Sequence, residues 1–173
     1  MTRSFLFSAG VVCLASFAAA YPPPPKAEAK IEYEKLAKGV ADGFCQNLLK
    51  QDFDAVIKAC DFPIIFEGGK TLAKAEDFRK ELDQIPAESL KEIKISVQEA
   101  VSAEKFDAWG KVLDKPPHVL QNETRLKAMK ERIGKDGWVV SLKAEHGGQA
   151  EDRVGLVLVL FKNGKPRIVG FED

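Results

Sequence analysis

Few side chains in this 173-residue sequence have the types and the context that chemistry requires. The most promising carboxylate is Glu67, which directly follows the apolar run 63–66. A glutamate whose pKa is raised by an apolar pocket can act as a general acid or base. The competing interpretation is a solvated turn residue, because Gly68 and Gly69 come next and glycines are typical of hairpin turns. The local sequence favours the turn, and Glu67 is kept as the candidate for catalysis.

Metal and cofactor chemistry has weaker signals still. The two histidines, His118 and His146, are far apart, and no His-x-His, His-x-x-x-His or Cys-x-x-Cys spacing occurs. A dedicated metal site is usually recognised by such closely spaced ligands. The sequence also lacks Gly-x-Ser-x-Gly, Walker-type and Rossmann-type glycine motifs. We therefore expect neither a dedicated metal site nor a cofactor.

The first 20 residues predict where the protein works. Arg3 is the only charged side chain before an apolar run that ends in three alanines at Ala20. A positive start, a short apolar middle and small residues at the end are the three parts of a secretory signal peptide. The run is too short for a membrane span, and Cys13 lacks the small preceding residue of a lipidation site. We expect cleavage after Ala20 and a secreted or periplasmic protein.

The chain that remains after cleavage is expected to be nearly neutral and free of the membrane. Cleavage removes only Arg3 from the 26 basic side chains, which are matched by 26 acidic ones. Binding to nucleic acid or to an anionic membrane surface requires clustered positive charge, so neither partner is expected. The proline-rich residues 21–26 are expected to form an extended spacer. Residues 27–173 then have the length of a single domain.

Cys45 and Cys60 remain after signal cleavage, and two interpretations of them stay open. In an oxidising compartment the pair could form one disulfide. Free cysteine is also among the most buried residue types, so both could be small core residues. The choice depends on how the segments that carry them pack together.

Apolar spacing predicts mainly helices in the first half of the chain. Residues 26–49 form the longest predicted helix, because apolar side chains recur there every three or four residues. Shorter helices are predicted at 52–59, with Asp52 as the N-cap, and at 75–85. Between them, residues 63–72 are predicted to form a small hairpin.

The second half is predicted to contain a helical insertion and a sheet. Residues 103–134 are expected to be helical, with a break at two consecutive prolines. The stretch 154–161 is apolar throughout, which predicts a strand buried on both faces. Asn163-Gly164 is a strong hairpin signal, so a returning strand should follow. Strands are predicted at 93–98, 138–142, 154–161 and 167–171.

Two segments of the sequence resemble the nuclear transport factor 2-like fold, also called SnoaL-like or cystatin-like. Residues 44–72 (FCQNLLKQDFDAVIKACDFPIIFEGGKTL) are similar to that family's long helix, its break and its first strand. Residues 154–171 (VGLVLVLFKNGKPRIVGF) are similar to its closing hairpin. The resemblance implies an α+β fold in which a cone-shaped, curved antiparallel sheet wraps around N-terminal helices. The helical insertion 103–134 departs from that pattern.

The resemblance also implies where chemistry would take place. In ketosteroid isomerase-like members of the family, a tyrosine on the first helix donates to an oxyanion, and a carboxylate at the first hairpin acts as the base. Here the tyrosine position is taken by Phe44, which has no hydroxyl, and the carboxylate position falls on Gly68, next to Glu67. Stabilising an enolate requires a positioned donor as well as a base. Isomerase chemistry of this kind is therefore not expected.

Four aromatic side chains are candidates for lining a ligand pocket in the cone, because large rings offer much contact area. They are Phe44, Phe66, Trp109 and Trp138. Trp138 begins a predicted strand and could instead belong to the sheet core. Trp109 lies in the insertion and could cap the open end of the cone.

Three functional hypotheses follow. The leading one is a secreted or periplasmic, non-catalytic domain that binds a small apolar ligand or a protein partner. The resemblance implies dimers through the open sheet face, and a homodimer would explain why 154–161 is apolar on both faces. The alternative is a small-molecule lyase or isomerase that uses Glu67, and the third is an envelope module that docks through 103–134. A buried Glu67 beside a second polar group in a cavity would favour the enzyme, and a solvent-facing Glu67 would count against it.

Overall fold

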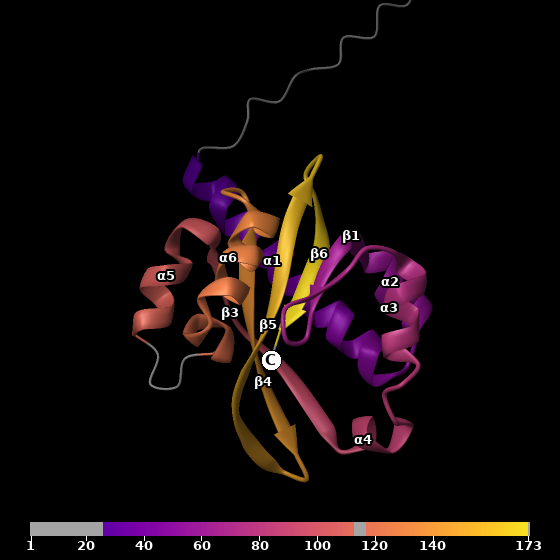
Figure 1. Ribbon diagram of the computed structural model, residues 1–173. Coiled ribbons are helices and arrows are strands. Elements are labelled where there is room, and N and C mark those ends of the chain that lie inside the picture. Colours follow the sequence, from indigo (N-terminus) through magenta and orange to yellow (C-terminus); the bar gives the residue numbers. More distant parts are fainter. Residues whose placement is uncertain (1–25, 113–116, 173) are drawn as a thin grey trace, which may run out of the picture.

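The computed structural model describes residues 26–112 and 117–172. Over these residues the chain is an α+β fold, with N-terminal helices and a curved, open sheet (Figure 1). The predicted signal peptide at 1–20 and the prolines of the spacer lie outside the described residues. No helix within the described ranges is long and apolar enough to cross a membrane.

The first half of the chain forms helices around a small hairpin, as the apolar spacing predicts. Its elements are α1 (Lys26–Leu49), α2 (Phe53–Ala59), β1 (Cys60–Phe66), β2 (Lys70–Leu72), α3 (Ala75–Leu82) and α4 (Ala87–Lys91). Asp52 caps α2 as predicted, because its side chain accepts a hydrogen bond from the Ala55 amide at 3.1 Å. The predicted helix 75–85 ends at Leu82, and a separate helix that the sequence analysis did not predict, α4, follows Pro86.

The second half contains the predicted helical insertion and the remaining strands. Its elements are β3 (Ile93–Ser102), α5 (Ala103–Lys111), the short 3-10 helix η1 (His118–Gln121), α6 (Glu123–Ile133), β4 (Trp138–His146), β5 (Gln149–Lys162) and β6 (Lys165–Glu172). Each predicted strand is present, and each extends beyond its predicted bounds. The predicted turn at Asn163 and Gly164 joins β5 to β6, and both residues adopt positive φ angles of 52° and 73°.

The strands form one sheet in the order β2-β1-β6-β5-β4-β3. Four of the five neighbouring pairs are antiparallel, whereas β1 and β6 are parallel. An antiparallel pair can be joined by a tight turn, but a parallel pair needs a long connection. Here residues 67–164 separate β1 from β6, so no turn constrains their direction.

Helices cover both faces of this sheet, and β5 contributes side chains to a core on each side. On one face Val157 and Val159 pack in a first core with side chains of α1, α2 and α3. On the other face Leu156 and Leu158 pack in a second core with Phe106 of α5 and with side chains of α6. Figure 1 shows α2 and α3 well separated from α5 and α6, with the strands between them. The period-2 geometry of a strand explains why a run that is apolar at every position needs two covering layers.

The second core bears on the idea of a dimer through the sheet face. The observation behind that idea was the second apolar face of β5. In the structure this face lies under α5 and α6 of the same chain, so a second subunit is not needed to bury it. Helices α5 and α6 of the predicted insertion are thus part of the folded core.

A network of charged side chains fastens α6 to β1, the second strand of the sheet. Arg132 of α6 donates hydrogen bonds to the carbonyl oxygens of Pro63 (2.6 Å) and Asp61 (2.7 Å), and to the Asp61 carboxylate (3.1 Å). Lys162 donates to the same carboxylate at 2.8 Å. Partial burial raises the pKa of Asp61, but the hydrogen bonds from Lys162 and Arg132 outweigh it and lower the pKa. Asp61 is therefore ionised at neutral pH and holds the insertion against the sheet.

Candidate functional site

The most suitable binding site is a cavity of about 270 Å³ at one end of the concave face of the sheet. We call it the apolar cavity, because most of its lining is hydrocarbon. It is lined by Leu48, Glu67, Ile85, Ser89, Leu90, Ile93, Ile95, Leu142, Ala144, Gly155 and Phe171. These residues come from the end of α1, the β1–β2 turn, the α3–α4 region and four neighbouring strands, β3 to β6.

Local sequence explains how the cavity is formed. Ile93 and Ile95 alternate along β3, so both side chains point to the same face of the strand. Gly155 has no side chain, and a Cβ atom there would lie 3.5 Å from the Cβ of Leu142, within the space that now remains open. The alternation of side chains along β3 thus supplies part of the apolar lining, and the missing side chain of Gly155 leaves the space.

Helix α4 contributes Ser89 and Leu90 to the lining of the cavity, although no helix was predicted there. Pro86 ends the preceding helical stretch, and the chain then turns back into one helical turn and a half. The Ser89 hydroxyl donates a hydrogen bond to the Pro86 carbonyl oxygen at 2.7 Å, which places the neighbouring Leu90 over the apolar lining. The available signal was a proline followed by Ala-Glu-Ser-Leu, a short run with good helix formers.

Glu67 lies at the rim of the apolar cavity and is exposed to solvent. The two residues after it have φ angles of +75° and +79°, which glycine adopts at no steric cost. Arg125 of α6 lies against this turn, because Cβ atoms on Gly68 and Gly69 would each meet one of its side-chain atoms at 3.0 Å. The Arg125 guanidinium is also 3.5 Å from the buried carboxylate of Glu172. The turn that carries Glu67 therefore packs on the insertion.

Phe44 and Phe66 lie behind the apolar cavity, not in its lining. Phe44 is only 2% exposed, and its ring centroid is 6.1 Å from that of Phe171. The Phe66 ring is 6.2 Å from the same partner. Phe171 itself lines the cavity, so the two predicted residues support its wall. Phe171 was not among the predicted pocket residues, although it lies in the predicted returning strand.

The two tryptophans are on different faces of the sheet. Trp138 is 7% exposed and belongs to the first core, at the far end of the strands from the apolar cavity. Trp109 packs against the second core, with its ring stacked on Phe106 at 5.6 Å, and its indole N–H donates to Glu99 at 2.6 Å. The structure thus brings Phe44 and Phe66 together but not the tryptophans. Helix α4 lines the apolar cavity, whereas Trp109 lies on the other side of the sheet.

Cys45 and Cys60 are both buried and free in this structure, and both lie in the first core. The Cys60 thiol donates to the Val56 carbonyl oxygen at 3.3 Å. The structure therefore agrees with small core residues and does not form the disulfide that the sequence left open. Burial raises the pKa of each thiol from 9.0 to about 12, with a smaller contribution from Asp42 at Cys45 and an opposing one from Arg167 at Cys60.

Native Cys45 and Cys60 are expected to resist thiol reagents at pH 8. The shift in pKa lowers the thiolate fraction by about a thousand-fold, and burial blocks access. Titration with a disulfide reagent should detect no fast-reacting thiol in the native chain after signal cleavage and two after denaturation. If the denatured chain has no free thiol, Cys45 and Cys60 form a disulfide instead.

The same pKa shifts predict an alkaline loss of stability. The folded-state pKa lies above the unfolded value, so the stabilising contribution is complete below pH 9 and is lost as the pH rises towards 12.

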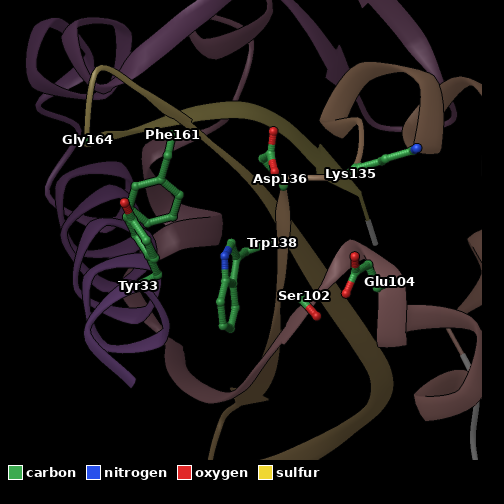
Figure 2. A pocket seen from close by; sticks show the side chains of 9 residues that line it. Tyr33, Ser102, Glu104, Lys135, Asp136, Trp138, Phe161 and Gly164 are labelled. Carbon is green, nitrogen blue, oxygen red and sulfur yellow. The ribbon is translucent and has the colours of Figure 1, made fainter. Parts of the chain in front are cut away.

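A second cleft, of about 380 Å³, lies at the opposite end of the strands (Figure 2). We call it the aromatic–acidic cleft. Its lining consists of Tyr33, Ser102, Glu104, Lys135, Asp136, Gly137, Trp138, Phe161 and Gly164. The Tyr33 and Phe161 rings pack edge to face, with centroids 4.6 Å apart. The lining is more polar than that of the apolar cavity, and no residue of it was predicted to bind a ligand except Trp138.

Within the described residues, no three His, Cys, Asp or Glu side chains come together in a group that could hold a metal ion. His146 is near Glu92, with 3.6 Å between the imidazole Nε2 and a carboxylate oxygen, and both side chains are more than half exposed. The pair lies at the tip of the β4–β5 hairpin and the start of β3, outside both cavities.

The sequence matches no protein-family model and no curated protein. Among solved structures, the chain is similar to a protein of unknown function with a cystatin-like fold from Nostoc punctiforme (TM-score 0.49, 12% identity, 84% of this chain and 90% of that one). It is also similar to a ketosteroid isomerase-like protein from Erwinia carotovora atroseptica (0.49, 10%, 82% and 94%). A third is a nuclear transport factor 2-like protein of unknown function from Cytophaga hutchinsonii (0.40, 10%, 77% and 83%). At such low similarity these likenesses carry no argument about activity or ligand.

Proposed function

We propose that this chain is an exported, non-catalytic domain that holds one small apolar molecule in the apolar cavity. The observation that carries the proposal is the lining of that cavity. Nine of its eleven lining residues are aliphatic, aromatic or glycine, and the other two are Glu67 at the rim and Ser89. Burying an apolar ligand against such a surface removes hydrocarbon from water on both sides, which is the main driving force for binding of this kind.

The volume of the cavity limits the size of the ligand. A dry engineered cavity of about 150 Å³ accepts benzene, and pockets for drug-sized ligands range from roughly 300 to 1,000 Å³. At about 270 Å³ the apolar cavity falls between these values. A molecule with one or two rings, or a short hydrocarbon chain, is therefore the class of ligand that fits.

The absence of catalysis is inferred from the surroundings of Glu67. A general base gains strength when an apolar environment disfavours its charge, but Glu67 is exposed at the rim. Phe44, at the position where the resemblance places a tyrosine donor, carries no hydroxyl and lies behind Phe171. A lyase or isomerase that uses this carboxylate lacks its second component at that position.

Export is the part of the proposal that rests on residues 1–20. Their single basic residue, short apolar run and terminal alanines have the pattern of a cleavable signal. A domain with a partly open apolar cavity would serve outside the cytoplasm as a carrier or a sensor of a small molecule.

Filling the apolar cavity is expected to abolish binding of an apolar probe. Ala144 lines the cavity, so Ala144→Phe places a ring in the space that a ligand would occupy. The control is Ala108→Phe, which adds the same ring at an exposed position on α5, across the sheet. The full chain would be expressed, purified after export and titrated with 6-propionyl-2-(dimethylamino)naphthalene, a two-ring probe whose fluorescence shifts to the blue in apolar surroundings.

We expect saturable binding by the unmodified chain and by Ala108→Phe, and at least ten-fold weaker binding by Ala144→Phe. Thermal unfolding of each variant shows whether it is folded. If the larger ring of Ala144→Phe disturbs folding, Ala144→Leu fills less space and should bind the probe with an affinity between those of the unmodified chain and a filled cavity. Equal binding by a folded Ala144→Phe, or no saturable binding by the unmodified chain, would contradict the proposal.

A further inference from the structure

The aromatic–acidic cleft is independent of the apolar cavity. Ser102 ends β3, whereas Ile93 begins it, and Tyr33 and Leu48 lie about four helical turns apart along α1. The two lining sets share no residue. A ligand in one site would therefore touch different side chains from a ligand in the other.

The charged groups at the cleft are mainly negative. Glu104 in the first turn of α5 and Asp136 before β4 both line it, and neither makes an ion pair with any described residue. Lys135 is the one basic residue in the lining, and Figure 2 shows its side chain extending away from the aromatic rings. The carboxylates are therefore available to a positively charged ligand, whereas an anion would be repelled by both.

The aromatic side of the cleft offers a surface that suits an organic cation. Tyr33 is 39% exposed, and its ring is held edge to face against Phe161. The faces of aromatic rings carry negative charge density and attract cations, and their hydrocarbon surface also packs against an apolar body. In Figure 2 the rings of Tyr33, Phe161 and Trp138 lie on one side and Glu104 on the other.

A buried polar atom in the lining points in the same direction. The Ser102 hydroxyl is buried and has no hydrogen-bond partner among the described residues. Ser102 is at the N-cap position of α5, but its side chain does not make the usual capping hydrogen bond. Buried hydroxyls in proteins nearly always have a partner, and a rotation about χ1 that turns this hydroxyl into the cleft would allow a bound ligand to supply one.

We propose that the aromatic–acidic cleft binds a small organic ammonium ion with an apolar body. The negative charges of Glu104 and Asp136 attract the ammonium group, and the apolar body packs on Tyr33 and Phe161. The volume of about 380 Å³ accommodates a single ring with an alkylamine side chain.

Three probes that share one body and differ in charge test this assignment. They are 2-phenylethylamine, its neutral counterpart 2-phenylethanol, and the anion phenylacetate. The full chain, purified after export with a nitrogen-15 label, is titrated with each probe while the amides of Gly137 and Gly155 and the indole N–H of Trp138 are followed by NMR. Gly137 and Trp138 report on this cleft, and Gly155 reports on the apolar cavity.

We expect the amine to shift Gly137 and Trp138 and to bind at least five-fold more tightly than the alcohol. Glu104→Gln and Asp136→Asn should each weaken amine binding by about two- to five-fold, as expected for a partly exposed ion pair, and added salt should weaken it further. The matched control is Glu76→Gln, which removes a carboxylate from the same helical position, the first turn of α3.

Equal affinity for amine and alcohol would overturn the proposal, as would shifts confined to Gly155 or affinity that survives both carboxylate substitutions. No shift at Gly137 and Trp138 with any probe would overturn it too. The probe binding at the apolar cavity, tested with Ala144→Phe, is measured in a separate experiment, so either proposal can fail without the other.

Discussion

Replacing Phe106 by alanine is expected to lower the free energy of unfolding by about 3–5 kcal/mol, as for other fully buried phenylalanines. Phe106 is on α5 and is 0% exposed. Its ring stacks on Trp109 and packs in the second core with Met129, Leu156 and Leu158. Removing it leaves a cavity between the insertion and the sheet that neighbouring side chains fill only in part. Equilibrium unfolding in urea, followed by far-UV circular dichroism, measures the change.

A matched exposed residue separates this effect from a general sensitivity of the protein. Ile31 on α1 is 69% exposed, so Ile31→Ala should change stability by no more than about 0.5 kcal/mol. A Phe106→Ala variant as stable as the unmodified chain would mean that α5 and α6 do not form a core with the sheet. The second face of β5 would then be open, and the argument for a sheet-face dimer would return.

Replacing Gly137 by alanine is expected to lower the free energy of unfolding by an amount at the upper end of about 1–3 kcal/mol, the usual range for overpacking. Gly137 lies between α6 and β4, and an added Cβ would be 2.4 Å from the Cβ of Ile133 and 2.5 Å from its carbonyl oxygen. Because one of these atoms belongs to the backbone, the clash cannot be relieved by rotating a side chain. The Gly137 carbonyl oxygen also accepts a 2.8 Å hydrogen bond from the Ala103 amide, so a shift there disturbs the start of α5.

The same substitution in α1 should act in the opposite direction. A Cβ on Gly39 would meet nothing within 4 Å, so Gly39→Ala should stabilise the chain by about 0.5–1 kcal/mol through the higher helix propensity of alanine. Urea unfolding of both variants under the same conditions gives the comparison. If Gly137→Ala were as stable as the unmodified chain, the packing of α6 against the start of β4 would differ from the one described.

Local patterns in the sequence predicted most of the elements, and the misses have specific causes. Asp52, Asn163 and Gly164 sit in a cap and a turn whose chemistry involves a few neighbouring residues, and these predictions are confirmed. Helix α4 is too short to show a helical period, so only Pro86 marked the region. The parallel pairing of β1 with β6 has no local signature at all.

The candidate site could be predicted only in part. Glu67 and the apolar strand positions were identifiable from their neighbours, because turns and alternation are short-range features. Phe171, Leu90 and Gly155 become cavity residues only when strands and a helix from distant parts of the chain converge. Trp109 and Trp138 were predicted to line the same pocket, but they lie on opposite faces of the sheet.

Side chains in a strand alternate and every position from 154 to 161 is apolar, so the sequence predicts that both faces of β5 are buried. The cover of the second face became visible only in the folded structure, where Phe106 and Met129 of the insertion pack against it and no second subunit is needed to bury it. The difference is one of range. Alternation is written into consecutive residues, whereas the choice of covering partner depends on contacts between segments tens of residues apart.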